Sequence, residues 1–370
     1  MRVSTTKVDA MHAVVSAIME RKVLWLLAVV PVLLVLAPIM PEASSLLFIL
    51  SVLAIVPLAA LLSLATGQVA ARTGHAIGGL LNATLGNLTG LIIGLAALRA
   101  GEYLLVKASL AGAIVANTLF MTGAAFLLGG VKHQVLSFNN ASTRLQMGLL
   151  FPAAFALMAP SALAGMDSQA LPQSLSLTIA IILLVSYGFS LVFTLGTHAK
   201  EFAACSGGET GEHIWPVPAG VIVLLGTTVA LALVSEIFVG SLAGASASLG
   251  LTPAFAGFIV VAIAGATADM TAAFGAARDN RLDLSLAISF GSSTRIALFV
   301  APVLVLLSYA LGPEPMSLQF WPGAIVMIFI AALAATLATA SGHAAWFTGL
   351  LMLMIYAAFG ATLFILPPAH

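Results

Sequence analysis

The sequence predicts an all-α membrane protein that crosses the bilayer about eleven times. Of its 370 residues, 61% are hydrophobic and only 7% are charged, whereas a soluble protein carries about 25% charged residues. Apolar runs of about 17–25 residues, long enough to span a bilayer, recur along the whole chain. Two of these runs also contain polar side chains, which are costly inside a membrane and mark pathways or binding sites.

The predicted spans are separated by turn-forming or charged residues such as Arg72-Thr73-Gly74 and Gly312-Pro313. Their cores lie near residues 24–39, 45–66, 77–98, 106–130, 145–164, 174–196, 217–240, 253–277, 284–309, 320–340 and 344–366. The N-terminal segment, residues 1–23, is polar with mixed charge. The run that follows ends at Met40-Pro41-Glu42 instead of a small-residue cleavage site, so we expect a first span and not a cleaved signal.

A long acidic connection, residues 197–216, divides the chain into a half of six spans and a half of five. If the span 24–39 is set aside, residues 45–196 and 217–366 each hold five spans. An odd number of spans gives the two sets opposite orientations. This pattern predicts two inverted repeats, an architecture typical of secondary transporters.

The positive charges in the loops predict the orientation. With the N-terminus in the cytoplasm, only Arg99 and Lys107 fall outside, and cytoplasmic loops are rich in Lys and Arg. Ten Lys and Arg then fall inside: Arg2, Lys7, Arg21, Lys22, Arg72, Lys132, Arg144, Lys200, Arg278 and Arg281. We therefore expect a multi-pass protein of the cell (inner) membrane, in contact with lipid, with a cytoplasmic N-terminus and linker and an external C-terminus.

The two polar runs are the second spans of their sets. They read GGLLNATLGNLTGLIIGLAAL at 78–98 and FIVVAIAGATADMTAAFGAA at 258–277. Polar, Gly-interrupted spans in corresponding positions point to a transporter's midplane site. Asn87, and Asn117 in the next span, supply amide oxygens that suit hard cations. Hydrogen bonding between helices is the alternative role for both amides.

Three charged residues fall inside predicted spans: Glu236, Asp269 and Arg295. Each should face the protein interior, because a charge facing lipid is costly. Asp269 is the candidate cation or proton site, and a structural pair with Arg295 is the alternative. Arg295 has three candidate roles: contacting an anion, standing in for a cation, or acting as a structural partner. Glu236, near the outer end of its span, is a candidate gating residue or an ordinary interfacial acid.

Several function classes lack support. The net charge is zero and favours no nucleic-acid partner. Cys205 is the single cysteine, so there is no disulfide framework. No nucleophile–base pair or metal-ligand cluster predicts an enzyme, and no cofactor is expected. His75, at the edge of the first polar run, is a candidate for a proton pathway or an ordinary loop residue.

Longer segments resemble the calcium:proton antiporters of the cation/calcium exchanger superfamily. The matching segments include GGLLNATLGNLTGLIIGLAALRAGE and KASLAGAIVANTLFMTG in the first half, and LGLTPAFAGFIVVAIAGATAD and DLSLAISFGSSTRIALFVAPVLVL in the second. The resemblance covers most of residues 24–366. It implies alternating access at a midplane site, where a cation such as calcium and protons compete for the same carboxylates. The residues implied at this site are Asp269 and Asn87 as metal ligands, with Asn117, Thr267, Ser292, Ser293, Arg295 and Gly90 around them.

The chain departs from the family pattern at the site. Gly90 and Asp269 stand where the family has glutamates, Ala266 replaces an asparagine, and Arg295 stands where the family usually has glutamine. A divalent ion in a site of about zero net charge gains little to offset its dehydration. The alternatives to calcium:proton exchange are therefore transport of a monovalent cation or charged organic molecule, and a non-transporting role. A cation site survives if Asp269 lies beyond hydrogen-bond reach of Arg295 and opens to water.

Overall fold

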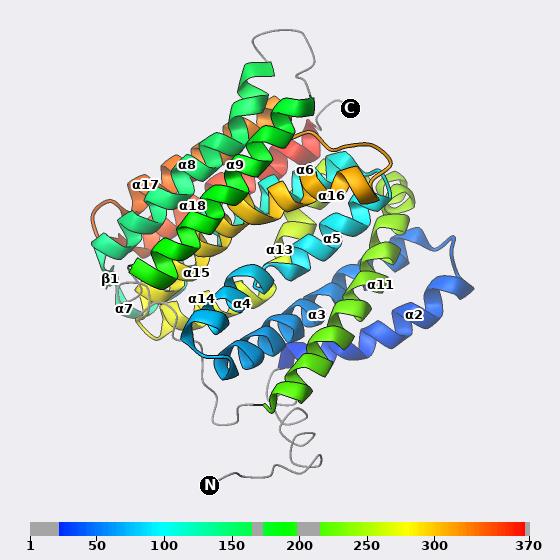
Figure 1. Cartoon of the computed structure of the whole chain (residues 1–370), viewed down its shortest axis with the longest axis horizontal. Helices are drawn as coiled ribbons and strands as arrows, with labels where there is room; N and C mark the ends of the chain where they lie inside the picture. The colour runs from blue at the N-terminus through cyan, green and yellow to red at the C-terminus, as the bar shows by residue number, and fades with distance from the viewer. Residues whose placement is uncertain (1–21, 165–172, 198–214, 367–370) are drawn as a thin grey trace.

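The computed structural model describes residues 22–164, 173–197 and 215–366, and most of these residues are helical (Figure 1). Helices occupy all eleven ranges in which the sequence predicts a span. Within the described residues, eight helices are long and apolar enough to cross a membrane, or nine if one bent pair counts as a single span. The number of crossings therefore stays a prediction. Most of the acidic linker, with Cys205, lies outside the described residues.

The first half of the chain forms helices in six ranges. They are η1 (Lys22–Ala28) with α2 (Val29–Ile39), α3 (Ser44–Arg72), α4 (His75–Leu85) with α5 (Leu88–Arg99), α6 (Tyr103–Val115) with η2 (Ala116–Met121) and α7 (Thr122–His133), α8 (Asn140–Ala164), and α9 (Gln173–Leu191) with η3 (Val192–Thr197).

The second half forms helices in five ranges. They are α11 (Val217–Leu249), α12 (Pro253–Phe255) with η4 (Ala256–Val261), α13 (Ala262–Gly265) and α14 (Thr267–Arg278), α15 (Leu282–Arg295) with η5 (Ile296–Val300) and α16 (Ala301–Leu311), α17 (Pro322–Thr339), and α18 (Trp346–Ile365).

Helix ends follow from the residues at the breaks. Gly74 and Gly250 have φ angles of 85° and 66°, a left-handed conformation that glycine adopts without a steric penalty. Pro253 and Pro322 begin the helices that follow, because the first turn of a helix does not need the missing N–H. The Thr252 hydroxyl accepts a hydrogen bond from the Phe255 N–H and caps α12.

A short two-stranded sheet joins the two halves of the chain. Strand β1 (Val135–Ser137) pairs antiparallel with β2 (His343–Ala345), so that Leu136 lies opposite Ala344. The all-α prediction missed this sheet, since strands of three residues are too short to show a period-two pattern. It ties the connection between α7 and α8 to the connection between α17 and α18.

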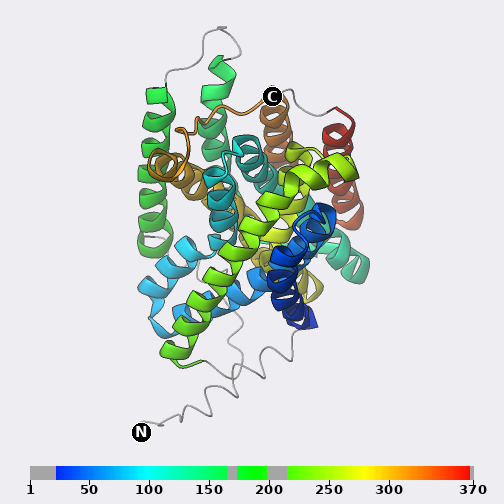
Figure 2. The same ribbon diagram turned by 90° about the vertical axis from the view of Figure 1, so that its right-hand side faces the viewer.

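The helices are arranged around two broken spans (Figures 1 and 2). Helices α3 and α11, the first of each set, pack against each other, with α2 beside them. The pairs α4–α5 and α13–α14 lie between this group and the group of α8, α9, α17 and α18 (Figure 1). The second span of each set therefore lies in the middle of the molecule, as a midplane site requires.

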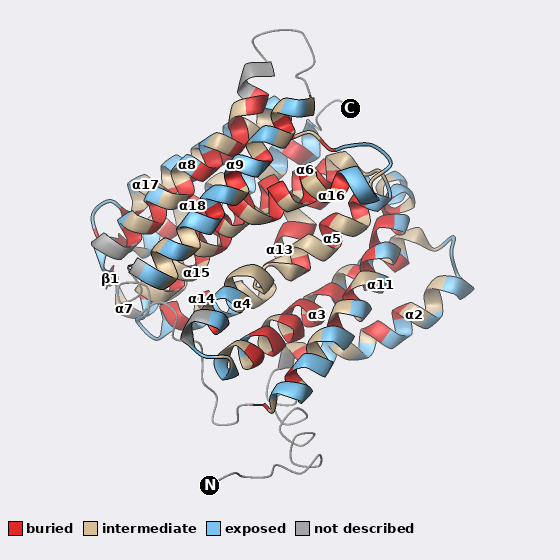
Figure 3. Cartoon of the chain, viewed as in Figure 1, coloured by how far each residue is buried: buried red, intermediate tan, exposed pale blue. Residues whose placement is uncertain are grey.

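Burial follows this arrangement (Figure 3). Apolar side chains such as Phe189 on α9 and Leu337 on α17 are exposed on the outside, which is the surface that lipid covers in a membrane protein. Inside, small residues allow backbones to meet. A Cβ on Gly112 of α6 would lie 2.2 Å from the Phe258 carbonyl oxygen of η4, so only glycine permits this contact between the two sets.

Candidate functional site

The two polar spans are both broken near their middle. In the first span α4 ends at Leu85 and α5 begins at Leu88, with Gly86 and Asn87 between them. In the second, α13 ends at Gly265 and α14 begins at Thr267, and the span bends by 59°. A break leaves backbone N–H and C=O groups without intrahelical partners. Transporters use such groups to contact substrates.

Asp269 lies in the first turn of α14. The N-terminus of a helix carries a partial positive charge that stabilises an acid at this position. The corresponding first turn of α5 has no acidic residue. The carboxylate of the site therefore comes from the second set alone.

Arg295, the last residue of α15, lies close to Asp269. Its Nη2 is 3.9 Å from the Asp269 Oδ2, and the exposed fractions of the two side chains are 20% and 19%. A charge-assisted hydrogen bond would need about 2.7–2.9 Å, so the two groups attract each other without closing a hydrogen-bonded pair. The distance agrees with the first condition that the sequence set for a surviving cation site, and the role of Asp269 as a cation site stays a prediction.

A cluster of amides and a hydroxyl joins the two sets beside this pair. The Ser292 hydroxyl donates to Asn87 Oδ1 at 3.1 Å and accepts a hydrogen bond from Asn117 Nδ2 at 3.1 Å. Asn87 Nδ2 donates to the Ser292 carbonyl oxygen at 3.3 Å. Asn117 is fully buried, and its Oδ1 has no partner. Both predicted amides are thus brought together, and one acceptor oxygen is left free.

A small cavity of about 40 Å³ lies against this cluster. Its lining residues come from both sets: Asn87, Gly90, Ser109, Leu110, Ala113, Asn117, Val261, Ala262, Gly265, Ala266, Ser292, Ile296 and Val300. One water needs about 10–15 Å³ of such space, so the cavity is large enough for a dehydrated ion. A Cβ built on Gly90 meets no atom within 4 Å. The space beside Gly90, where the family has a glutamate, is therefore empty of protein atoms.

Two predicted site residues direct their hydroxyls to helix backbone. Thr267 Oγ1 donates to the carbonyl oxygens of Ile263 and Ala264, both at 3.0 Å. Ser293 Oγ donates to the Ser289 carbonyl oxygen at 3.1 Å. Neither residue lines the cavity, although both lie next to residues that do. Because both hydroxyls act as donors in these bonds, their oxygen lone pairs are not used by them.

The two predicted gating residues lie elsewhere. Glu236 Oε1 is 3.4 Å from Arg99 Nη1, and both side chains are more than half exposed. Glu236 therefore does not replace the missing carboxylate at Gly90. The backbone of His75 begins α4, but its side chain lies outside the described residues. The structure shows no contact between Glu236 and Asp269 among the described residues, and the gating roles of Glu236 and His75 stay predictions.

Two residues near the site carried no functional signal in the sequence. Ser109 lines the cavity within the segment KASLAGAIVAN, where its small size resembles its neighbours. The Tyr187 hydroxyl of α9 donates to the Ala83 carbonyl oxygen at 2.8 Å, close to the end of α4. This bond satisfies a carbonyl near the break, which sequence spacing does not reveal because α9 is distant in the chain.

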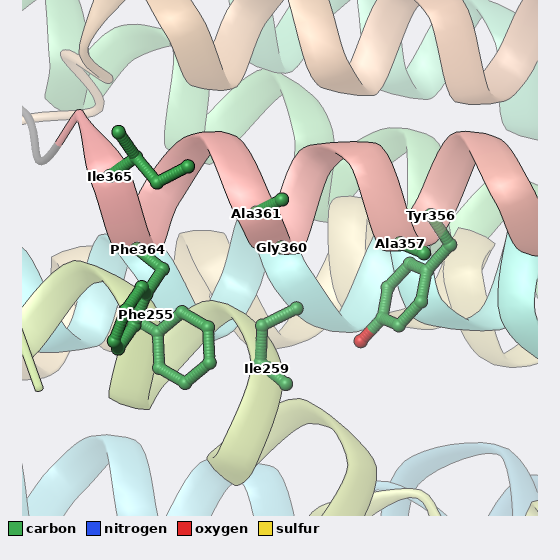
Figure 4. A pocket seen from close by; sticks show the side chains of 8 residues that line it. All are labelled: Phe255, Ile259, Tyr356, Ala357, Gly360, Ala361, Phe364 and Ile365. Atoms are coloured by element: carbon green, nitrogen blue, oxygen red, sulfur yellow. The ribbon is translucent and has the colours of Figure 1, made fainter.

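A larger cavity lies between α12–η4 and α18 (Figure 4). This cavity has a volume of about 470 Å³, and its lining is apolar except for the hydroxyl of Tyr356. The lining residues are Phe255, Ile259, Tyr356, Ala357, Gly360, Ala361, Phe364 and Ile365. None of these side chains carries a charge. The smaller cavity is the candidate substrate site, because Asn87, Asn117 and Ser292 give its lining polar oxygens. Asp269 does not line this cavity but follows the lining residue Ala266 in the same broken span.

The geometry suits a single hard cation held by few ligands. Asp269 offers a carboxylate on the second broken span. Asn87, Asn117 and Ser292 offer neutral oxygens in the cavity lining. Among the described residues, no three His, Cys, Asp or Glu side chains lie together as a conventional metal centre would require. Any cation here would rely mainly on amide, hydroxyl and backbone oxygens.

Comparisons with known proteins identify relatives of this chain. The family model described as sodium/calcium exchanger protein matches residues 43–196 and 219–365. The chain is 38% identical to the Ca(2+)/H(+) antiporter of Synechocystis sp. over 340 residues, covering 86% of this chain and 91% of that protein. It is 34% identical to the Ca(2+)/H(+) antiporter ChaA of Bacillus subtilis, with 90% and 95% covered.

A solved structure is also similar. The structure of native YfkE superposes with a TM-score of 0.79 at 31% sequence identity, covering 92% of this chain and 98% of that chain. The two stretches matched by the family model nearly coincide with the two sets of five predicted spans.

Proposed function

Because the chain belongs to the sodium/calcium exchanger protein family, we propose that it is a secondary active antiporter that moves a cation, calcium by default, in exchange for protons. The relatives named as Ca(2+)/H(+) antiporters cover nearly the whole chain, at up to 38% identity. Their exchange activity is therefore the first expectation for this protein. It is an activity of membrane transport, with cations and protons as the substrates.

The observation that carries the proposal is the position of Asp269. This carboxylate lies at a break in a central span, 3.9 Å from the guanidinium of Arg295. A carboxylate in that position can hold a cation or a proton, but not both. This competition couples the two movements, since release of one species permits binding of the other.

Access must alternate between the two sides of the membrane. The cavity is lined by α5, α6, η2, η4, α13, α15 and η5, which come from both sets of helices. A shift of one group against the other would open it to either side. We propose that the N-terminus faces the cytoplasm and that the protein resides in the cell (inner) membrane, as the loop charges predict.

A second candidate is exchange of a monovalent cation. Gly90 removes one negative charge from the site, and Arg295 adds a positive one. When Arg295 moves aside, Asp269 alone balances one positive charge. A divalent ion would keep an uncompensated charge in a site of low polarity, which is costly. This candidate is favoured by the contact between Arg295 and Asp269.

Transport in liposomes tests both candidates. Purified protein is reconstituted, a pH gradient is imposed, and calcium, manganese, sodium and potassium are offered in turn. We expect cation uptake that Asp269→Asn abolishes and that Asp279→Asn retains, because Asp279 is an exposed acid at the end of α14. Selective uptake of sodium or potassium would identify a monovalent cation, and not calcium, as the substrate. No uptake of any of the four ions by the wild type would refute cation:proton antiport by this protein.

A further inference from the structure

We infer that Arg295 is a tethered cation that occupies Asp269 whenever the carrier is empty, so that the return step does not require a proton. The inference rests on the proposed function. It assigns to Arg295 control over how tightly cation movement is coupled to protons. It goes beyond a stabilising pair, because the residue changes its partner during each cycle.

The contact between the two residues is close enough for attraction and too long for a closed pair. The distance from Nη2 to Oδ2 is 3.9 Å, and the Arg295 Nε is buried without a hydrogen-bond partner. A structural ion pair in a protein interior normally satisfies its N–H groups, since unpaired ones are costly. Arg295 therefore has the geometry of a group with more than one position.

A glycine allows the close approach of the guanidinium to the break in the first polar span. Gly86, at the break between α4 and α5, lies beside it: a Cβ there would be 3.4 Å from Arg295 Nη1. Ser292 and Ile296, on the same helical stretch as Arg295, line the cavity. The guanidinium thus lies beside a residue without a side chain, on the helical stretch that contributes Ser292 and Ile296 to the cavity lining. A small rotation of its long side chain would separate it from Asp269.

The consequence concerns the empty carrier. A buried carboxylate that loses its cation must be neutralised before the protein changes conformation, because an uncompensated buried charge is destabilising. In a site with carboxylates alone, a proton supplies that neutralisation. Here the guanidinium is already present and can supply it. Some cycles would then move a cation inward or outward with no proton returning.

The discriminating measurement is the number of protons moved per cation. Cation and proton fluxes are recorded together in the same liposomes, for the wild type, Arg295→Gln, Arg295→Lys and the control Arg278→Gln. Arg278 is exposed at the end of α14. Its variant therefore removes the same guanidinium group at a position outside the site. The cation is whichever of the four ions the wild type carries.

We expect Arg295→Gln to raise the ratio of protons to cations by about twofold, a difference of about 0.4 kcal/mol, because the paired return step no longer competes with the protonated one. Arg295→Lys, which keeps the positive charge, should lie between wild type and Arg295→Gln, and Arg278→Gln should match the wild type. A purely structural role would change flux or yield but leave the ratio unchanged.

Two results would overturn the inference while the proposed function stands: an equal ratio in wild type and Arg295→Gln, or full coupling in the wild type. If Arg295→Gln fails to fold, the same fluxes are measured for the wild type and Arg295→Lys. Full coupling of protons to cations in both proteins would then overturn the inference. Absence of any cation flux in the wild type removes the proposed function and this inference with it.

Discussion

A glutamate restored at Gly90, with Arg295 neutralised, should give the site a strong affinity for calcium. The position has room, because a Cβ on Gly90 meets no atom within 4 Å and the adjoining cavity holds about 40 Å³. The added carboxylate would lie in the first turn of α5, in the place that Asp269 has in α14. The double variant Gly90→Glu/Arg295→Gln would then present two carboxylates and no cation.

The expected gain follows from charge. A unit charge pair at 4 Å is worth about 4 kcal/mol at the effective dielectric constant typical of proteins, and a divalent ion doubles this to about 8 kcal/mol. Desolvating the new carboxylate takes back several kcal/mol. A net gain of about 1.5–3 kcal/mol in the free energy of calcium binding remains. Relative to a variant without the new charge, this gain lowers the KM for calcium by about tenfold to a hundredfold.

The assay is calcium uptake driven by a pH gradient in liposomes, over a range of calcium concentrations. The matched control is Gly90→Gln/Arg295→Gln, which has the same side-chain size and lacks the new charge. Calcium should also raise the melting temperature of the glutamate variant more than that of the glutamine variant, since a ligand stabilises the state that binds it. A folded glutamate variant with the same KM as its glutamine control would refute the assignment of this cavity as the cation site.

Two further predictions concern packing around the site. Ser292→Ala removes the two hydrogen bonds that join the Ser292 hydroxyl to the amides of Asn87 and Asn117. This variant should destabilise the protein by about 1–3 kcal/mol, because buried partners are left unsatisfied. The control Ser285→Ala should be neutral, because Ser285 lies on the same helix and its buried hydroxyl has no partner among the described residues. Gly112→Ala forces a Cβ against the backbone of η4 and should cost about 1–3 kcal/mol or more, whereas Gly226→Ala, with open space beside it, should not. Thermal unfolding of the purified variants in detergent checks both, and equal melting temperatures within either pair would contradict it.

The sequence predicted the spans because each span consists of many consecutive apolar residues. All eleven ranges are helical, and the turns at Gly74 and Gly250 fall where glycine interrupts apolar runs. The polar second spans indicated the centre of the molecule, because polar side chains inside a membrane are costly unless they face the protein interior or a cavity. The proximity of Asp269 and Arg295 also followed from the rarity of charges in such spans.

Individual side-chain partners were harder to predict, because a hydrogen bond depends on angles that spacing does not fix. Thr267 and Ser293 were predicted at the site, and their hydroxyls donate to helix carbonyls; their role as ligands stays a prediction. Glu236 pairs with Arg99 from another span, a contact between residues far apart in the chain. The helix breaks depend on local backbone geometry at Gly86 and Ala266, which a pattern of small residues suggests only weakly.

The account depends on one carboxylate that a cation and a proton share. Calcium binding to the detergent-purified protein, measured by titration calorimetry at an alkaline and at an acidic pH, tests this most directly. We predict one binding site at alkaline pH that is weakened at acidic pH, lost in Asp269→Asn and kept in Asp279→Asn. Binding of equal strength in Asp269→Asn and wild type, or at both pH values, would contradict the central role of Asp269.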